Sequence, residues 1–440
     1  MPVRTMFESV KRFRFWPAML LILASFVYVG VNVPKHREFS PFDEYVYLDY
    51  LDKVPTQLFV HQFEAVGDFA RNEISCRGVV GFGPFGQGCD RGSHRDDVTY
   101  PYSGYTGADI YSPAYFAITW TLAQPLTWLG IDLLDAGRLV GALWLAAGLL
   151  LLYGAMRELG VARRLAVGLN LVVMISPAIY WADTYLATDA PSLAAGAALL
   201  YTGIRAARGK LAVGWLIPLA VLVVLLKVQN LAAVLLVSLA LVGLAIWNAY
   251  RPSPTETGRH RFPLKASLLA TAAVVAGVLA QTVWLVIRSH SGMPPVVSSG
   301  ADTNPQLLTQ QALVSEAFKY LFKVGGSDLN SGVTGTVAAN MLTALSVAGV
   351  IAMIVDRRAH SRTVVTFAAV TLGVGLLIGP ALAIATLVLT GSYFPLPIRY
   401  GIVLLPAFVI CAAVFLSRSR KVDTIVLVAG LAMAIVVIVI

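Results

Sequence analysis

The chain has 440 residues, of which 57% are hydrophobic and 13% are charged. A water-soluble globular domain carries roughly 25% charged residues, so this composition excludes a soluble protein. Apolar runs of about 18 or more residues recur from Trp16 to Ile440. Each run is long enough to cross a hydrocarbon core of about 30 Å as a helix. We therefore predict an all-α fold in which residues 1–440 form a single polytopic membrane domain.

The formal net charge is +9, and the basic residues that produce it lie in short clusters between the apolar runs. A nucleic-acid-binding protein instead gathers its Lys and Arg side chains on one face. In a membrane protein such clusters mark the loops that stay on the cytoplasmic side. We therefore expect membrane lipids, and no nucleic acid, to be partners of this chain.

The first apolar run, Trp16 to Val33, is long and has no small-x-small cleavage site before the charged Lys35. It is therefore predicted to be a retained membrane helix rather than a cleaved signal peptide. Basic residues precede it, so we expect the N-terminus in the cytoplasm and the following segment 34–109 outside. These basic residues are Arg4, Lys11, Arg12 and Arg14.

Ten further apolar runs are candidate spans, which makes about eleven with the first. The basic clusters between them all fall on one side if segment 111–130 does not cross the membrane. That segment holds Pro113 and Pro125 and is rich in aromatic residues, which favours an interfacial or re-entrant position. The alternative, in which it crosses, would invert the basic clusters that follow. The ten runs are 139–156, 165–183, 190–206, 211–227, 230–249, 266–288, 336–355, 364–390, 400–417 and 423–440.

Two regions between spans are too long to be simple connections, and both should fold on the outer surface. The first is 34–135, with juxtamembrane helices, and the second is 289–335. Within the second, residues 305–324 carry an apolar stripe at helical spacing beside two lysines. This pattern predicts an amphipathic helix that lies in the membrane interface.

Cysteines are few, and two of the three share one polar loop. Cys76 and Cys89 could form a disulfide if that loop faces an oxidising compartment, and otherwise they would stay free thiols. Cys411 lies inside a predicted span.

Familiar soluble-enzyme motifs are missing or out of context. Residues 81–86 match the pattern G-x-G-x-x-G, but they follow no strand and open no helix, so we reject a nucleotide site. Residues 94–97 (His-Arg-Asp-Asp) could supply metal ligands, yet no second ligand cluster lies at metal-site spacing, and a solvated loop explains them better. The sequence has no Walker motif, no G-x-S-x-G and no His-Glu-x-x-His.

The first outer loop begins with two adjacent acids, Asp43 and Glu44, followed by Tyr47 and Tyr50 on roughly the same helical face as Asp43. Taken alone, these residues fit a solvated interfacial helix equally well. The case for a site rests on other ionisable residues that the topology places at the outer ends of spans. A charge there is costly unless it is used or paired. These residues are Arg138, Asp183, Asp189, Lys227 and Arg399.

The order of these elements resembles the GT-C glycosyltransferases of the dolichyl-phosphate-mannose protein mannosyltransferase and aminoarabinose transferase type. The resemblance covers residues 40 to about 230 and resumes near residue 399. Departures are Ser112, where the family's run begins with proline, and Val228-Gln229, where it has Gly-Pro. The similar segments are Asp43-Glu44, Tyr111-Ser112-Pro113-Ala114-Tyr115, Arg138-Leu139-Val140-Gly141-Ala142-Leu143, Arg157-Glu158-Leu159-Gly160, Ser176-Pro177, Thr188-Asp189-Ala190-Pro191, Lys227 and Arg399-Tyr400 with Pro406.

The resemblance implies a membrane glycosyltransferase that moves a hexose or a pentose from a polyprenyl-phosphate donor to an acceptor hydroxyl. Asp43 would be the general base of an inverting reaction, with Glu44 and Asp189 as further catalytic candidates. Other side chains would hold the donor phosphate and stabilise the departing polyprenyl phosphate. The candidates for this second role are Arg399, Lys227, Arg138 and Tyr400.

A lipid-carried donor also follows from topology, because nucleotide sugars stay in the cytoplasm and the sequence offers no large cytoplasmic segment to bind one. We expect a multi-pass protein of the plasma (inner) membrane that acts on the cell envelope from the extracytoplasmic face. The acceptor stays open among a glycan, a lipid and a protein. No metal site is predicted, although a divalent metal ion stays open as a cofactor.

Two other classes of protein stay open. A transporter or a lipid-linked sugar flippase also buries charges in a helical bundle, but it more often shows an internal repeat and polar residues at mid-membrane. Here the charges lie at the outer ends of the spans. A membrane scaffold would need none of these ionisable residues.

Overall fold

The computed structural model describes residues 15–81, 83, 85–86, 89, 97–250, 262–292, 307–329, 332–417 and 419–439. Within them the regular structure is helical, and the β-type pairing is limited to two isolated bridges. The predicted all-α fold is therefore confirmed. Some sequence features lie outside the described residues: the basic residues Arg4 to Arg14, the basic stretch Arg251 to Arg261, and residues 94–96 of the possible metal run.

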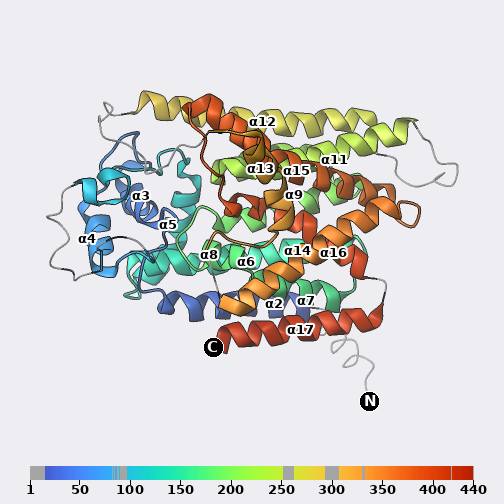
Figure 1. The fold of residues 1–440 in the computed structure, drawn as a ribbon, viewed down its shortest axis with the longest axis horizontal. Helices are drawn as coiled ribbons and strands as arrows, with labels where there is room; N and C mark the ends of the chain where they lie inside the picture. Colours follow the sequence, from blue (N-terminus) through green and yellow to red (C-terminus); the bar gives the residue numbers. More distant parts are fainter. Residues whose placement is uncertain are drawn as a thin grey trace, which may run out of the picture.

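Most of the chain forms long apolar helices that run side by side (Figure 1). Among the described residues, eight are long and apolar enough to cross a membrane, some of them together with an adjoining 3-10 turn. This is the helix content of a polytopic membrane protein. The eight are α2 (Trp16–Asn32), α6 (Leu133–Glu158), α11 (Leu231–Tyr250), α12 (Leu264–His290), α14 (Gly332–Val355), α15 (Arg362–Thr390), α16 (Leu405–Leu416) and α17 (Arg420–Val439).

The expected count of about eleven spans stays a prediction, because three of the expected spans are not among these eight helices. Helices α7 (Arg163–Met174) and α8 (Pro177–Asp183) are bent by 65° at the break between them, as in a broken span or a re-entrant loop. Pro177 explains the break, since proline is tolerated in the first turn of a new helix but not in a helix interior. Helix α9 (Ala190–Ala207) packs along α6, and α10 (Leu216–Leu226) has only 11 residues. Alone, α10 is too short to cross a hydrocarbon core.

Helices α3 (Glu44–Gln57), α4 (Asp68–Arg77) and α5 (Pro113–Thr127) gather at one end of the bundle, on the left of Figure 1. Their core is aromatic, with the rings of Tyr50 and Phe116 stacked 3.8 Å apart. Short 3-10 turns complete the connections in this region and elsewhere. These are η1 (Val33–Lys35), η3 (Asp97–Thr99), η4 (Pro101–Gly104), η5 (Val213–Trp215), η6 (Val228–Asn230) and η8 (Ile398–Leu404).

Segment 111–130 forms α5, a helix of 15 residues that is not among the candidate spans in the described part of the chain. Pro113 opens it and the Ser112 hydroxyl caps it by accepting from the Ala114 amide. A topology reporter fused after Gly130 should therefore give the same signal as one fused after Asp109. Opposite signals would mean that α5 crosses the membrane and that Arg138 lies on the other face.

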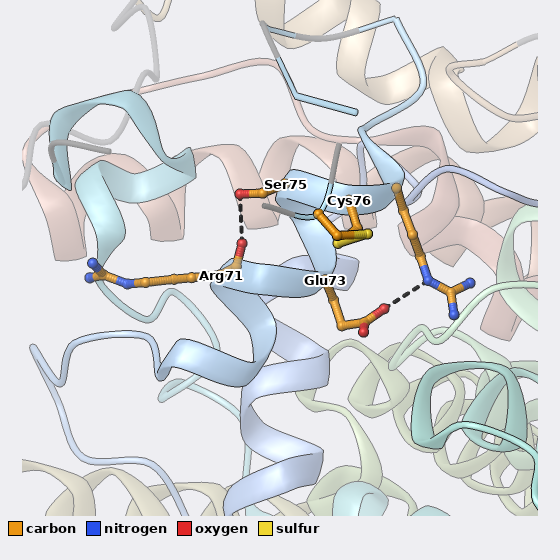
Figure 2. Close-up of a disulfide and its surroundings, with 6 residues drawn as sticks. Arg71, Glu73, Ser75 and Cys76 are labelled. Carbon is orange, nitrogen blue, oxygen red and sulfur yellow. Dashed lines mark hydrogen bonds and ion pairs between the residues drawn. A yellow bond between two sulfur atoms is a disulfide. The ribbon is translucent and has the colours of Figure 1, made fainter. Parts of the chain in front are cut away.

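Cys76, on α4, is bonded to Cys89, so the two cysteines of the polar loop form the disulfide that the sequence left open (Figure 2). Both should resist a membrane-impermeant thiol reagent in intact cells until a reductant is added. Cys411 is buried in α16 and serves as an internal control that stays unlabelled. Labelling of Cys76 and Cys89 before reduction would show that the bond is absent from the protein in cells.

The predicted helix in the second outer region is α13 (Gln310–Phe322). Its exposed side carries Val314, Phe318 and Phe322, whereas Glu316 and Tyr320 are buried against the bundle. The Glu316 carboxylate accepts from the Tyr393 hydroxyl at 2.9 Å and from the Leu396 amide at 3.1 Å. Helix α13 thus holds the segment that leads into η8, while its interfacial position stays a prediction.

Helix α9 and η8 are in direct contact. Gly196 lies against the backbone carbonyl of Val403, where no Cβ could fit. This close approach brings the start of η8, with Arg399 and Tyr400, to the end of α9 where Asp189 lies.

Candidate active site

Asp43 lies immediately before α3, in the left-handed conformation with φ 66° and ψ 6°. Aspartate tolerates this conformation better than most residues, and such backbone strain is concentrated at functional sites. The side chain does not cap the helix. Instead, its carboxylate accepts hydrogen bonds from the Tyr102 hydroxyl, from Arg399 Nη2 at 2.8 Å and from the Tyr47 hydroxyl at 3.4 Å.

Asp189 and Lys227 form a second, deeper ion pair beside the first. Asp189 precedes α9, and Lys227 follows the last turn of α10 with an extended backbone. Their side chains are only 4% and 1% exposed. Arg399 joins the two pairs, because its Nε lies 3.8 Å from the Asp189 carboxylate.

The structure therefore brings together five of the predicted site residues: Asp43, Asp189, Lys227, Arg399 and Tyr400. The Lys227 ammonium lies 5.4 Å from the centre of the Tyr400 ring. Two carboxylates face two cations, so the cluster is close to neutral in the unliganded chain. Within the described residues, Arg399 Nε and Nη1 are buried and make no hydrogen bond. Buried donors of this kind are available to an incoming anion.

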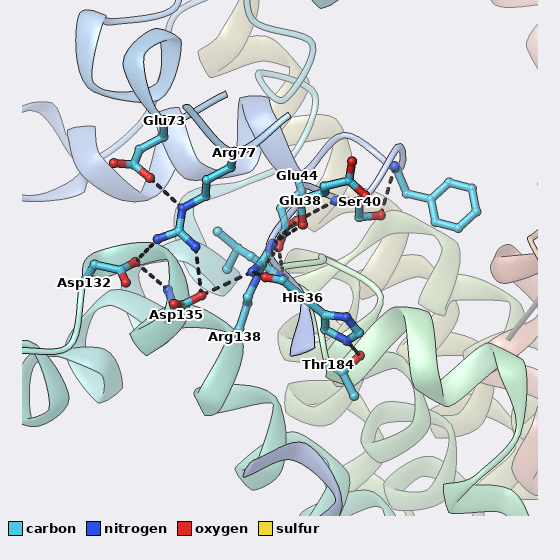
Figure 3. Close-up of polar contacts among 12 residues, drawn as sticks. His36, Glu38, Ser40, Glu44, Glu73, Arg77, Asp132, Asp135, Arg138 and Thr184 are labelled. Carbon is cyan, nitrogen blue, oxygen red and sulfur yellow. Dashed lines mark hydrogen bonds and ion pairs between the residues drawn. The ribbon is translucent and has the colours of Figure 1, made fainter. Parts of the chain in front are cut away.

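Glu44 and Arg138 form a separate, fully buried pair (Figure 3). All five N–H bonds of the Arg138 guanidinium have acceptors: the two Glu44 oxygens, the Asp135 carboxylate and the backbone carbonyls of His36 and Glu38. A guanidinium has five N–H donors in all, so none is left for a phosphate.

The oxygens of the Glu44 carboxylate likewise all have hydrogen-bond donors. Besides Arg138, the carboxylate accepts from the Ser40 amide and from the Leu186 amide, both at 2.7 Å. These bonds tie the loop before α3 to α6 and to the start of the α8–α9 connection. The geometry therefore favours a positioning role for Glu44 and Arg138, which hold Asp43 at the head of α3 without themselves facing a ligand.

Tyrosines surround the Asp43 carboxylate. Burial raises the pKa of Tyr102 well above its ordinary value, with the Asp43 carboxylate as the second cause. Burial raises the pKa of Tyr47 in the same way, with Tyr111 and Asp43 as further causes. Both hydroxyls therefore stay protonated and donate to Asp43. Thr188 in turn donates to the Tyr47 oxygen at 3.3 Å.

Tyr102 is a residue of the candidate site that the sequence analysis missed. It lies in the connection between α4 and α5, with φ 56°, and its ring packs against Gly107. It is 59 residues from Asp43 in the sequence, and no motif marks it. Asp183, which the sequence analysis placed near the site, is fully buried, and its oxygens make no hydrogen bond within the described residues.

No group of three or more His, Cys, Asp and Glu side chains in the described part of the chain could hold a metal ion. The two acids of the cluster, Asp43 and Asp189, each pair with a cation.

Neither a protein-family model nor a curated protein sequence matches this chain. Solved structures do match this chain in fold, and the likeness agrees with the GT-C-like membrane fold that the sequence predicted. One is the oligosaccharyltransferase of Archaeoglobus fulgidus in its apo form, with a TM-score of 0.50 and 11% sequence identity. Another is the same organism's AglB oligosaccharyltransferase in complex with an inhibitory peptide and a dolichol-phosphate, again with a TM-score of 0.50 and 11% identity.

The match with the apo oligosaccharyltransferase covers 96% of this chain and 55% of that chain. The match with the complex covers 97% of this chain and 55% of that chain. The chain therefore spans about half the length of the structures that it resembles. At this level of identity the likeness concerns the fold.

Proposed function

We propose that this chain is a membrane glycosyltransferase that moves a hexose or a pentose from a polyprenyl-phosphate donor to an acceptor hydroxyl. One observation carries the proposal: a carboxylate, Asp43, lies 2.8 Å from a buried guanidinium, Arg399, that still has free N–H groups. A base for the acceptor and a binding group for an anionic leaving group thus lie side by side. The GT-C fold class supports the same reaction type.

In the proposed reaction, Asp43 accepts the proton of the acceptor hydroxyl while the hydroxyl oxygen attacks the anomeric carbon. The bond between that carbon and the phosphate oxygen breaks, and polyprenyl phosphate leaves with the electron pair. Attack opposite the leaving group inverts the stereochemistry. A carboxylate accepts about four hydrogen bonds, and Asp43 receives three here, so one more hydroxyl can bind. Its side chain is 20% exposed, against 4% for Asp189, which favours Asp43 as the base.

Arg399 and Lys227 then serve the leaving group. Both cations are almost buried, so their attraction to a phosphate is far stronger than it would be in water. Tyr400 lies against the Lys227 ammonium and restricts its position. Glu44 and Arg138 act indirectly, because they fix the backbone on which Asp43 stands.

A lipid-carried donor fits the position of the cluster, at the ends of long apolar helices where a polyprenyl chain can lie in the bilayer. A structure of similar fold holds a dolichol-phosphate, which is a lipid phosphate of this class. We place the site on the extracytoplasmic face of the plasma membrane, with the N-terminus in the cytoplasm. The acceptor is a glycan, a lipid or a protein.

The proposal is tested with the purified full-length chain and a radiolabelled polyprenyl-phosphate sugar, offered together with glycan, lipid and peptide acceptors. A glycosyltransferase releases polyprenyl phosphate and transfers the label to one acceptor class. A flippase or transporter, reconstituted in vesicles, would move the intact labelled lipid or sugar across the bilayer without releasing the phosphate. Movement without release would overturn the proposal.

Replacing Arg399 or Lys227 with Met should weaken donor binding about tenfold or more and also slow turnover. The phosphate is anionic both before and during the reaction, so each cation contributes to the ground state and to the transition state. Steady-state kinetics against donor concentration measure both effects. Arg37→Met is the control, because Arg37 is an exposed cation in the same outer region. An unchanged KM for the donor in both site variants would contradict the phosphate-binding role.

A further inference from the structure

A polar hollow lies at the opposite end of the bundle from the Asp43 cluster. It has a volume of about 450 Å³ and is lined by the C-terminal turn of α6 and by residues that follow α9. Helix α6 connects the two ends: Arg138 lies near its start and Arg157 near its finish. At 1.5 Å per residue Arg138 and Arg157 are about 30 Å apart along the helix, roughly the thickness of a hydrocarbon core.

Cations dominate this hollow. Within the described residues, Arg157, Arg208 and Lys210 line it together with one carboxylate, Glu158. Arg205, next to the hollow, also pairs with Glu158. Lys210 Nζ lies 2.7 Å from Glu158, Arg208 Nη1 at 3.7 Å and Arg205 Nε at 4.0 Å.

The helix ends offset only part of this positive charge. Helices α6 and α9 both end here, and a helix C-terminus carries about half a negative charge. Four cations against one carboxylate and two helix ends leave an excess of about two positive charges. The Arg205 Nε is also buried without a hydrogen-bond partner in the described part of the chain.

An apolar groove of about 460 Å³ adjoins the hollow. Lys210 lines both cavities, so the groove continues directly from the cationic hollow. The groove runs between η5 and the start of α12, where its lining includes Val213, Ala266 and Leu269. Trp215 and Leu264 lie next to the groove, and their exposed fractions are 62% and 57%. Large exposed apolar side chains of this kind are expected at a membrane interface.

We propose that this end of the molecule binds one anionic phospholipid, whose phosphate lies among Arg157, Arg208 and Lys210 and whose acyl chain lies in the groove. The occupant has to be both anionic and apolar, because a cationic hollow and an apolar groove meet at one residue. The volumes are in the range of small-molecule sites. This site is separate from the proposed transferase reaction and goes beyond it.

The test measures lipid binding to the purified full-length chain in detergent by native mass spectrometry, with dioleoylphosphatidylglycerol and dioleoylphosphatidylcholine as probes. Wild-type chain should bind the anionic lipid at least tenfold more tightly than the zwitterionic one. The double variant Arg208→Gln with Lys210→Gln should lose about tenfold of that affinity. Both residues are partly exposed, at 41% and 47%, so the variant should fold.

The matched control is Arg163→Gln with Arg164→Gln, which removes two exposed cations near the same end but outside the hollow. This control should change the affinity less than twofold. An equal loss in both double variants would reveal general surface attraction and overturn the site. Equal binding of the two lipids by wild-type chain would overturn it as well.

A third variant, Ala266→Trp, fills the groove and distinguishes a lipid from a free phosphate. It should weaken binding of the anionic lipid at least fivefold while leaving competition by glycerol 3-phosphate unchanged. If Ala266→Trp binds the lipid as wild type does, the acyl chain does not lie in the groove and the proposal fails.

Discussion

Asp43→Asn should lower the rate of sugar transfer by about 10²-fold or more in a protein that still folds and binds its donor. Asparagine keeps the size of the side chain and an oxygen that accepts from Tyr102 or Arg399, but it cannot take the acceptor proton. General base catalysis contributes about 10²–10⁴-fold, which sets the expected loss. The measurement is kcat at saturating donor, alongside donor affinity measured separately.

Asp52→Asn is the matched control, since Asp52 lies on the same helix with an exposed side chain. It should transfer sugar at the wild-type rate. Glu44→Gln should cost less than Asp43→Asn, because Glu44 holds the loop and does not face the acceptor. A folded Asp43→Asn protein with wild-type kcat would show that another group is the base. Asp189 would then be the next candidate.

Arg138→Met should destabilise the chain by about 3–5 kcal/mol, the largest stability effect that we expect. The substitution removes the cation while the Glu44 carboxylate stays fully buried. Removing one partner of a buried ion pair costs about 3–5 kcal/mol of stability, because the remaining charge stays buried without a partner. Thermal unfolding of the purified protein in detergent measures the loss, and low yield from membranes would point the same way.

Arg77→Met provides the comparison. Arg77 pairs with Glu73, Asp132 and Asp135, whose side chains are 26%, 46% and 28% exposed. Water can solvate the carboxylates that Arg77→Met leaves behind, so this variant should lose less stability than Arg138→Met. If Arg138→Met unfolds with the wild-type midpoint but binds the donor more weakly, Arg138 is a phosphate ligand after all. If it unfolds early, the residue belongs to the framework that places Asp43.

The sequence by itself determined the class of structure. A hydrophobic run long enough to cross a bilayer can be identified as a helix from its own residues. The bilayer core offers no water, so each such segment has to satisfy its backbone hydrogen bonds internally, as a helix does. The two acids at the start of the outer loop and Lys227 after an apolar run were also visible. Each is costly near a membrane and therefore carries information without any neighbour.

Only the tertiary structure decided which of these residues act together. Asp43 and Glu44 are adjacent in the sequence, yet the Asp43 carboxylate accepts from Arg399 and the Glu44 carboxylate forms a fully buried ion pair with Arg138. The left-handed backbone at Asp43 separates them, and local sequence does not specify that turn. Arg399 is 356 residues from Asp43, and the two meet because Gly196 lets η8 pack directly on α9. Contacts of this kind depend on helix packing across the whole chain, which no local pattern of residues records.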